Sequence, residues 1–156
     1  IVEQLGQHAD KKFCNIVTGD LGLETEEEKA DMEKREADVK NVLDFVKETL
    51  GDAVSEVKPA VRLKSHPVCL TAGEGLSFEM EKYFQMMQPE SGIKAQRILE
   101  LNTEHPAFTA LENAVTADPE KAKIYAKLLY DQALLIAGLP LDDPSGYTDL
   151  VCELMK

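Results

Sequence analysis

The fold of this chain is decided near its C-terminus, where residues 119–137 read PEKAKIYAKLLYDQALLIA. Alanine, leucine and lysine favour a helix, and Pro119 suits a first helical position. The polar positions lie on one narrow face, at Glu120, Lys123, Lys127 and Asp131, and nearly every other position is apolar. A surface helix normally carries an apolar stripe little wider than 100°. This helix therefore needs cover on more than one side, and its own domain can supply only one cover.

A second helix is predicted after a short connection, because Gly138 suits a C-cap and Pro144 suits another helix start. A short loop makes two such helices antiparallel neighbours. Two hairpins related by a twofold axis would bury both apolar faces as a four-helix bundle. A larger monomeric core could also use the same residues. The predicted dimer-interface residues are Tyr125, Leu128, Leu129, Gln132, Leu135, Ile136, Tyr147, Leu150, Val151 and Leu154.

A methionine-rich helix is predicted between the Gly73-Glu74-Gly75 segment and Pro89. Large apolar residues recur there at the spacing that lines one side of a helix. Methionine is flexible and polarizable, which suits a surface that accepts many different side chains. The same residues could instead be ordinary core. The candidate binding residues are Leu76, Met80, Tyr83, Phe84 and Met87.

The rest of the chain predicts an α+β fold with a small sheet of about three strands. Residues 53–72 are rich in valine and broken by Pro59 and Pro67, which fits short or edge strands, and residues 96–101 form another candidate strand. A long N-terminal helix is predicted from a capping box at Thr25 to a stop at Gly51. The exposed amphipathic helix and the C-terminal helical hairpin complete this predicted fold.

Three helix starts, two of them those of the C-terminal hairpin, are predicted from proline at a first helical position. Pro106, Pro119 and Pro144 each follow a residue that can cap a helix, namely His105, Asp118 and Asp143. Residues 1–23 contain a short strand-like run at 12–17 and too few apolar residues to fold alone. We expect this segment to be the end of a preceding domain.

Composition narrows the possible partners. The formal charge is −12, from 29 acidic and 17 basic residues, and no stretch gathers lysine and arginine. Nucleic acid and anionic membranes are therefore poor partners, and no apolar run is long enough to span a membrane. The cysteines Cys14, Cys69 and Cys152 are widely spaced and form no C-x-x-C pair, which favours a reducing cytoplasm with buried or partly buried thiols.

No catalytic or metal-binding pattern is recognisable. Phosphate-binding loops, nucleophile elbows and H-E-x-x-H motifs do not occur, and His8, His66 and His105 are far apart in the sequence. We therefore expect no catalytic residue, no metal site and no cofactor in this chain. The patterns favour a non-catalytic module that associates with itself and with other proteins. The alternatives are a helical scaffold or adaptor domain that binds one defined partner and an enzyme piece with an unrecognised site.

Several short segments, taken in order, resemble the ninety-kilodalton heat-shock chaperones, nearest to their bacterial HtpG branch. The match extends over essentially the whole chain, and its combination of segments is more specific than any one of them. The segments are Lys11-Lys12-Phe13, Val17-Thr18, Arg62-Leu63, Ser65, Pro67-Val68-Cys69-Leu70, Met80-Glu81, Leu99-Glu100-Leu101-Asn102, His105-Pro106, Leu128-Leu129-Tyr130-Asp131-Gln132-Ala133-Leu134-Leu135, Gly138 and Leu141-Asp142-Asp143-Pro144.

The resemblance implies that residues 1–23 finish the family's middle domain and that residues 24–156 form its C-terminal dimerisation domain. It implies a cytoplasmic homodimer that contacts unfolded or partly folded client proteins. The family's exposed client-contacting helix corresponds to Leu76, Met80, Tyr83 and Phe84. ATP and magnesium would bind the N-terminal domain of the full-length protein, with help from the middle domain. This segment would therefore be non-catalytic, and the N-terminal and middle domains of the same chain would be among its partners.

Overall fold

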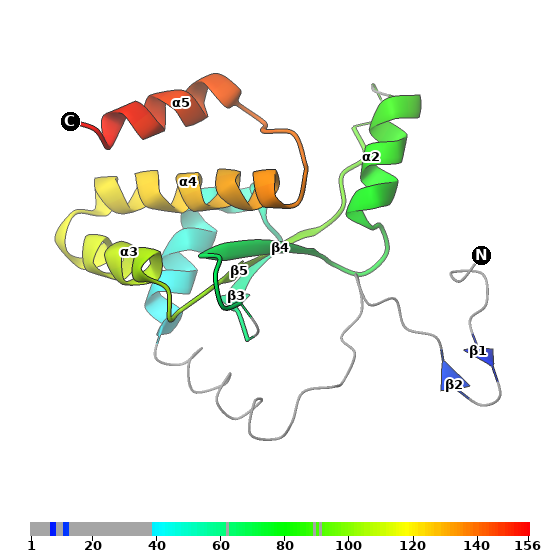
Figure 1. The fold of residues 1–156 in the computed structure, drawn as a ribbon, viewed down its shortest axis with the longest axis horizontal. Helices are drawn as coiled ribbons and strands as arrows, with labels where there is room; N and C mark the ends of the chain where they lie inside the picture. The colour runs from blue at the N-terminus through cyan, green and yellow to red at the C-terminus, as the bar shows by residue number, and fades with distance from the viewer. Residues whose placement is uncertain (1–6, 9–10, 13–38, 62, 89, 91) are drawn as a thin grey trace.

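The computed structural model describes residues 7–8, 11–12 and 39–156, except residues 62, 89 and 91. Two short strands, β1 (Gln7–His8) and β2 (Lys11–Lys12), pair in antiparallel fashion. Apart from Lys12, the strand-like run predicted at 12–17 lies outside the described residues. From residue 39 onward the chain folds into helices and a small sheet, and its last three elements are all helices (Figure 1).

A three-stranded sheet lies at the centre of the fold, as the sequence predicted. Its order is β3 (Glu56–Pro59), β5 (Arg97–Leu101) and β4 (Val68–Ala72), with β3 parallel and β4 antiparallel to the central β5. Burial alternates along β4 and β5, so one face of the sheet packs on the core. Pro59 ends an edge strand, where the lack of an N–H group does least harm to the sheet.

The core is formed by this sheet, the helical residues 39–50, helix α3 (Pro106–Ala117) and helix α4 (Pro119–Ile136). Residues 39–50 bury Val42, Leu43 and Val46, whose spacing places them on one side of the helix. Gly51 ends this helix at the predicted place, with a φ of 54° that glycine adopts at little cost. The rest of the predicted N-terminal helix, residues 25–38, lies outside the described residues.

The predicted helix starts at the three prolines are confirmed. Pro106, Pro119 and Pro144 occupy the first turns of α3, α4 and α5 (Pro144–Glu153). The preceding side chains cap the helices, because each accepts a hydrogen bond from a backbone N–H of the first turn. The bonds run from Ala107 N to His105 Nδ1 at 3.1 Å, from Lys121 N to Asp118 Oδ1 at 3.2 Å, and from Gly146 N to Asp143 Oδ1 at 2.9 Å.

Helices α4 and α5 form the predicted antiparallel hairpin, and α5 lies on the side of α4 away from the sheet (Figure 1). Gly138 adopts a φ of 66° just after α4, and Leu139 N donates to Leu134 O at 2.9 Å, so the end of the helix is closed in the usual left-handed way. Among the residues that the structure describes, none of the helices has the length and apolar character that crossing a bilayer requires.

The methionine-rich helix is present as α2 (Phe78–Met87), but its start differs from the prediction. Ser77 is the N-cap, because its hydroxyl oxygen accepts a hydrogen bond from Met80 N at 3.2 Å. Leu76 was predicted to lie on the helix, yet it precedes the cap and is half-buried against the core. A serine that can act as the N-cap makes the helix start two residues later than apolar spacing alone suggests.

Candidate interaction surfaces

Helix α2 projects from the body of the domain and leaves most of its apolar side chains in solvent (Figure 1). Of its ten residues, only Phe78 and Glu81 are buried. The exposed fraction is 61% at Tyr83, 83% at Met86 and 64% at Met87. Such a concentration of apolar surface on one short helix is typical of a protein-binding site.

Most of the predicted binding residues are accessible to solvent on α2. Met80, Tyr83 and Met87 are exposed, and Phe84 is half-buried, with its ring at a T-shaped angle to that of Tyr83 and 6.2 Å from it. Met86 was not among the predicted residues, although it is the most exposed of these side chains. Its position three residues after Tyr83, one helical turn on, was the signal that could have included it.

Helix α2 is joined to the sheet by a buried ion pair that the sequence did not reveal. Glu81 is fully buried and accepts from Arg97 Nη2 at 3.0 Å and from the backbone N–H of Ala95 at 2.8 Å. A buried carboxylate is tolerated only when its charge and lone pairs are satisfied in this way. This anchor therefore fixes the base of α2 to the start of β5.

Arg97 extends the same contacts to the helical hairpin. Its Nη1 donates to Tyr130 Oη on α4 at 3.0 Å and lies 3.7 Å from Asp142 Oδ2, in the connection between α4 and α5. Burial raises the pKa of Tyr130, which remains a neutral phenol and donates in turn to Ala53 O at 3.4 Å. One guanidinium group thus touches α2, α4 and the α4–α5 connection.

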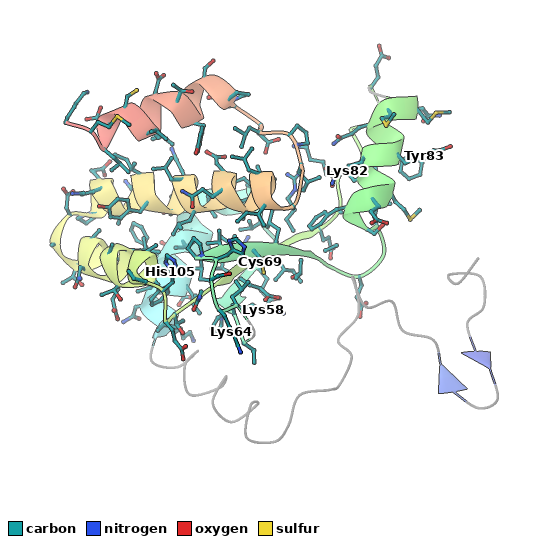
Figure 2. All side chains as sticks on the ribbon, in the orientation of Figure 1. Lys58, Lys64, Cys69, Lys82, Tyr83 and His105 are labelled. Carbon is teal, nitrogen blue, oxygen red and sulfur yellow. The ribbon has the colours of Figure 1, made fainter. Side chains whose placement is uncertain are left out.

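A second polar contact joins α2 to the hairpin near its surface. Lys82 Nζ donates to Ala137 O, at the C-terminal end of α4, at 2.9 Å. Figure 2 shows Lys82 on the side of α2 that faces the rest of the domain, and Tyr83 on the opposite side. Nearby, Lys94 Nζ bonds Asp142 Oδ1 at 2.7 Å. The apolar side of α2 is therefore free while its polar side is held.

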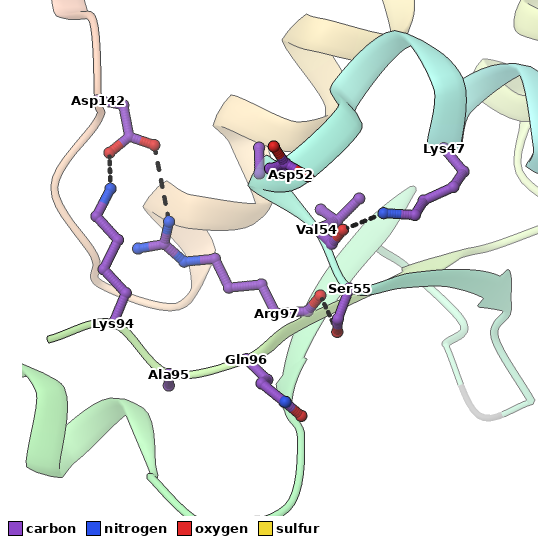
Figure 3. A pocket seen from close by; sticks show the side chains of 10 residues that line it. Lys47, Asp52, Val54, Ser55, Lys94, Ala95, Gln96, Arg97 and Asp142 are labelled. Atoms are coloured by element: carbon purple, nitrogen blue, oxygen red, sulfur yellow. Dashed lines mark hydrogen bonds and ion pairs between the residues drawn. The ribbon is translucent and has the colours of Figure 1, made fainter.

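An open cleft of about 420 Å³ lies beside Arg97 (Figure 3). Its cationic groups are already engaged: Lys47 donates to Gly51 O and Val54 O, and Lys94 pairs with Asp142. Within the described residues only Arg97 Nε is buried without a partner. In the same part of the chain, no cluster of three or more histidine, cysteine, aspartate or glutamate residues could hold a metal ion.

The hairpin carries a second exposed apolar surface. Leu135, Ile136 and Leu154 are 50%, 48% and 41% exposed, and helix α5 contains no buried residue at all. Of the other predicted interface residues, five are half-buried and two are buried within the chain. The half-buried residues are Tyr125, Gln132, Tyr147, Leu150 and Val151, and the buried ones are Leu128 and Leu129.

Acidic side chains surround the turn of the hairpin. The pKa of Asp131 is raised, first by partial burial and then by the nearby carboxylates of Asp142 and Asp143. Lys94 and Arg97 offset part of this charge through their contacts with Asp142. Lys94 and Arg97, just before and at the start of β5, thus bring positive charge to a turn whose own residues repel one another.

The described cysteines differ in exposure: Cys69 is half-buried, as predicted, but Cys152 on α5 is exposed. A cysteine on an outer helix has no core to enter, which explains why the prediction for Cys152 was wrong. Burial and the adjacent Glu100 carboxylate, which lies 3.7 Å from the sulfur, raise the pKa of Cys69 to about 12. The reactive thiolate form of Cys69 is therefore scarce at ordinary pH.

We expect Cys69 to react with a disulfide reagent at least about 30-fold more slowly than Cys152 at pH 8, since a low thiolate fraction outweighs the higher nucleophilicity of each thiolate. The measurement is the rate of thiol release in a Cys14→Ser background. Adding Cys152→Ser should remove the fast phase and leave the slow one. Equal rates in the folded protein would contradict the environment described for Cys69.

Exposed apolar surfaces on two helical parts of a small α+β domain are typical of the class of proteins that work through contacts with other proteins. The family model described as "Hsp90 protein" matches residues 1–156. The chain therefore belongs to the Hsp90 family of molecular chaperones, as its resemblance implied.

The curated relatives place it near the bacterial HtpG proteins. It is 42% identical over 155 residues to the chaperone protein HtpG of Clostridium perfringens and 40% identical over 154 residues to that of Bacillus subtilis. It is 41% identical over 155 residues to that of Natranaerobius thermophilus. Each match covers 99% of this chain but only 24–25% of the relative, so the chain spans about a quarter of their length.

Proposed function

We propose that the chain is the C-terminal homodimerisation and client-contacting domain of an ATP-dependent chaperone. In this proposal residues 24–156 form the domain and residues 1–23 finish the one before it. The observation that carries it is α5, a helix of ten residues with an apolar stripe but no buried side chain. A helix of that length is not stable without a packed face, so something outside the single chain has to cover it.

A second copy is the cover that fits best. Leu135 and Ile136 at the end of α4 and Leu154 at the end of α5 stay exposed in one copy, and a twofold axis beside the hairpin would pair them with their equivalents. The two antiparallel helices of one copy, packed against the two of the other, would form a four-helix bundle of a standard kind. The long-range repulsion between two chains of charge −12 opposes this association and weakens as salt is added.

The exposed face of α2 is the proposed client contact. Its methionines can adapt to many apolar side chains, so unfolded or partly folded proteins fit it better than one defined partner does. A dimer would present two copies of this face, which gives a client with several apolar segments a higher effective affinity. Binding to a single partner protein, and to no others, would favour the adaptor alternative.

The chemistry of the proposed chaperone cycle belongs to other parts of the protein. We infer that ATP and magnesium bind outside this segment, in the N-terminal domain, and that this domain is non-catalytic. By holding two copies together, the hairpin raises the effective concentration of their N-terminal domains for each other. The proposal includes a cytoplasmic location, the usual one for such a cycle.

The direct test of the dimer is the mass in solution as a function of protein concentration. Sedimentation equilibrium should give a dimer in the micromolar range and below, and the dimer should become tighter at higher ionic strength. A stable monomer at high micromolar concentration would overturn the dimerisation proposal.

The client contact has its own prediction. Tyr83→Ser combined with Met86→Ser removes two largely exposed apolar side chains, so we expect suppression of client aggregation to fall by about tenfold or more while the dimer mass is unchanged. The measurement is light scattering of a heat-unfolded client protein against chaperone concentration. Glu112→Ser with Asn113→Ser, on an exposed part of α3, is the matched control and should keep full activity. Full activity in the α2 variant as well would assign that face no part in client binding.

A further inference from the structure

We propose that the polar contacts of α2 form a tether that couples client docking on α2 to pairing of the α4–α5 hairpins. This inference rests on the proposed function, because it links the two binding events proposed above. It concerns residues that neither binding surface contains. The tether consists of Glu81, Lys82 and Arg97, with their partners at Ala137 and Asp142.

The anchoring of α2 is unusual because it is mainly polar. Phe78 is the only apolar side chain of α2 that is buried, so hydrophobic packing holds the helix only at its first turn. Beyond that turn its position is set by the Glu81–Arg97 pair at 3.0 Å and by the Lys82–Ala137 bond at 2.9 Å. Polar contacts of this kind hold a helix in one orientation only while both partners stay in place.

The partners of the tether lie where the hairpin turns. Ala137 is the C-cap of α4. The next residue, Gly138, is so close to Lys82 that a Cβ atom added to this glycine would lie 3.1 Å from Lys82 Nζ. Asp142 precedes the N-cap of α5 and lies within 3.7 Å of Arg97. The geometry of the connection therefore determines where α5 lies over α4, and the same connection holds α2.

Coupling through this tether is expected to be positive. A client that holds α2 also holds Lys82 against the end of α4, which restricts the connection to the geometry seen here. Pairing of the hairpins requires the same restricted geometry. Whichever event comes first therefore reduces the conformational entropy that is lost in the second. Linkage makes the effect reciprocal: client tightens the dimer by the same factor by which dimerisation tightens client binding.

The experiment measures both affinities in the full chain. A carboxymethylated, permanently unfolded protein serves as the client, and its binding is followed by fluorescence anisotropy, while dimer dissociation is followed by sedimentation with and without saturating client. In the unmodified chain we expect client to tighten the dimer by about fivefold, the lower end of common allosteric effects. Lys82→Met should bring that factor close to one, with both binding events retained.

Lys123→Met is the matched control, because Lys123 lies on α4 but pairs only with Glu120 among the described residues. It should keep the fivefold factor. An equal factor in Lys82→Met and in the unmodified chain would overturn the tether, and so would a factor of one in the unmodified chain. Absence of dimerisation or of client binding in the unmodified chain would instead overturn the proposed function itself. Failure of the tether and failure of the proposed function are therefore distinguishable.

Discussion

Glutamate at both Ile136 and Leu154 should convert the proposed dimer into a monomer that keeps its fold. Both side chains are about half exposed in one chain, so the substitutions leave the core untouched. In the dimer they would remove apolar contacts and add four negative charges to the interface, the two at Ile136 lying next to an already acidic turn. The four substituted positions of the dimer, at about 1 kcal/mol each, correspond to a loss of affinity of roughly 1,000-fold.

The measurement is the molecular mass in solution as a function of protein concentration. The far-ultraviolet circular dichroism, which reports the fold, should stay unchanged. Thr109→Glu with Thr116→Glu is the matched control, because it adds the same charge at exposed positions on α3, away from the hairpin. The control should remain a dimer. An Ile136→Glu/Leu154→Glu protein that still sediments as a dimer would show that the pairing surface, if there is one, lies elsewhere.

The choice of these residues depends on information that the sequence lacked. Leu128 and Leu129 looked equivalent to Leu135 in an almost wholly apolar helix, yet both are buried, and Leu129 belongs to the core of this chain. A charge at Leu129 would therefore test folding and not association. Periodicity shows that a helix needs cover on several sides, but it does not show which side its own domain covers.

Local signals were far more informative. The three proline helix starts and their caps were predictable because a cap involves residues only two or three positions apart. The sheet was predictable for the same reason, since valine-rich runs broken by proline need no distant partner to be recognised. Gly51 ended the helix before it through its own conformational freedom.

The tether of α2 was not predictable in the same way. In the strand Arg97-Ile98-Leu99-Glu100-Leu101, period two places Arg97 on the buried face with Leu99 and Leu101, which indicates that its charge needs a buried partner. The partner, Glu81, comes from a helix sixteen residues earlier, and nothing in the local pattern marks it among the many acidic residues of the chain. Only the tertiary structure brings the two charges together.

This buried pair gives the second large prediction: Arg97→Met should lower the free energy of unfolding by about 3–5 kcal/mol. The reason is the carboxylate that remains. Glu81 is fully buried and would keep only hydrogen bonds from Ala95 N and Gln85 Nε2, without a neutralising charge. Urea unfolding followed by circular dichroism measures the change, and the midpoint should shift without a large change in slope.

Glu81→Leu added to Arg97→Met should recover part of that loss, because it removes the uncompensated charge and fills the site with apolar volume. Recovery should stop short of the original stability by about 1–3 kcal/mol, since Ala95 N then lacks its buried acceptor. Lys94→Met serves as the control: its ion pair with Asp142 is half exposed on both sides, so its loss should cost less than about 1 kcal/mol. If Arg97→Met proved as mild as Lys94→Met, the Glu81–Arg97 pair would not be the buried anchor of α2, and the position of that helix would depend on Phe78 and on the Lys82–Ala137 bond.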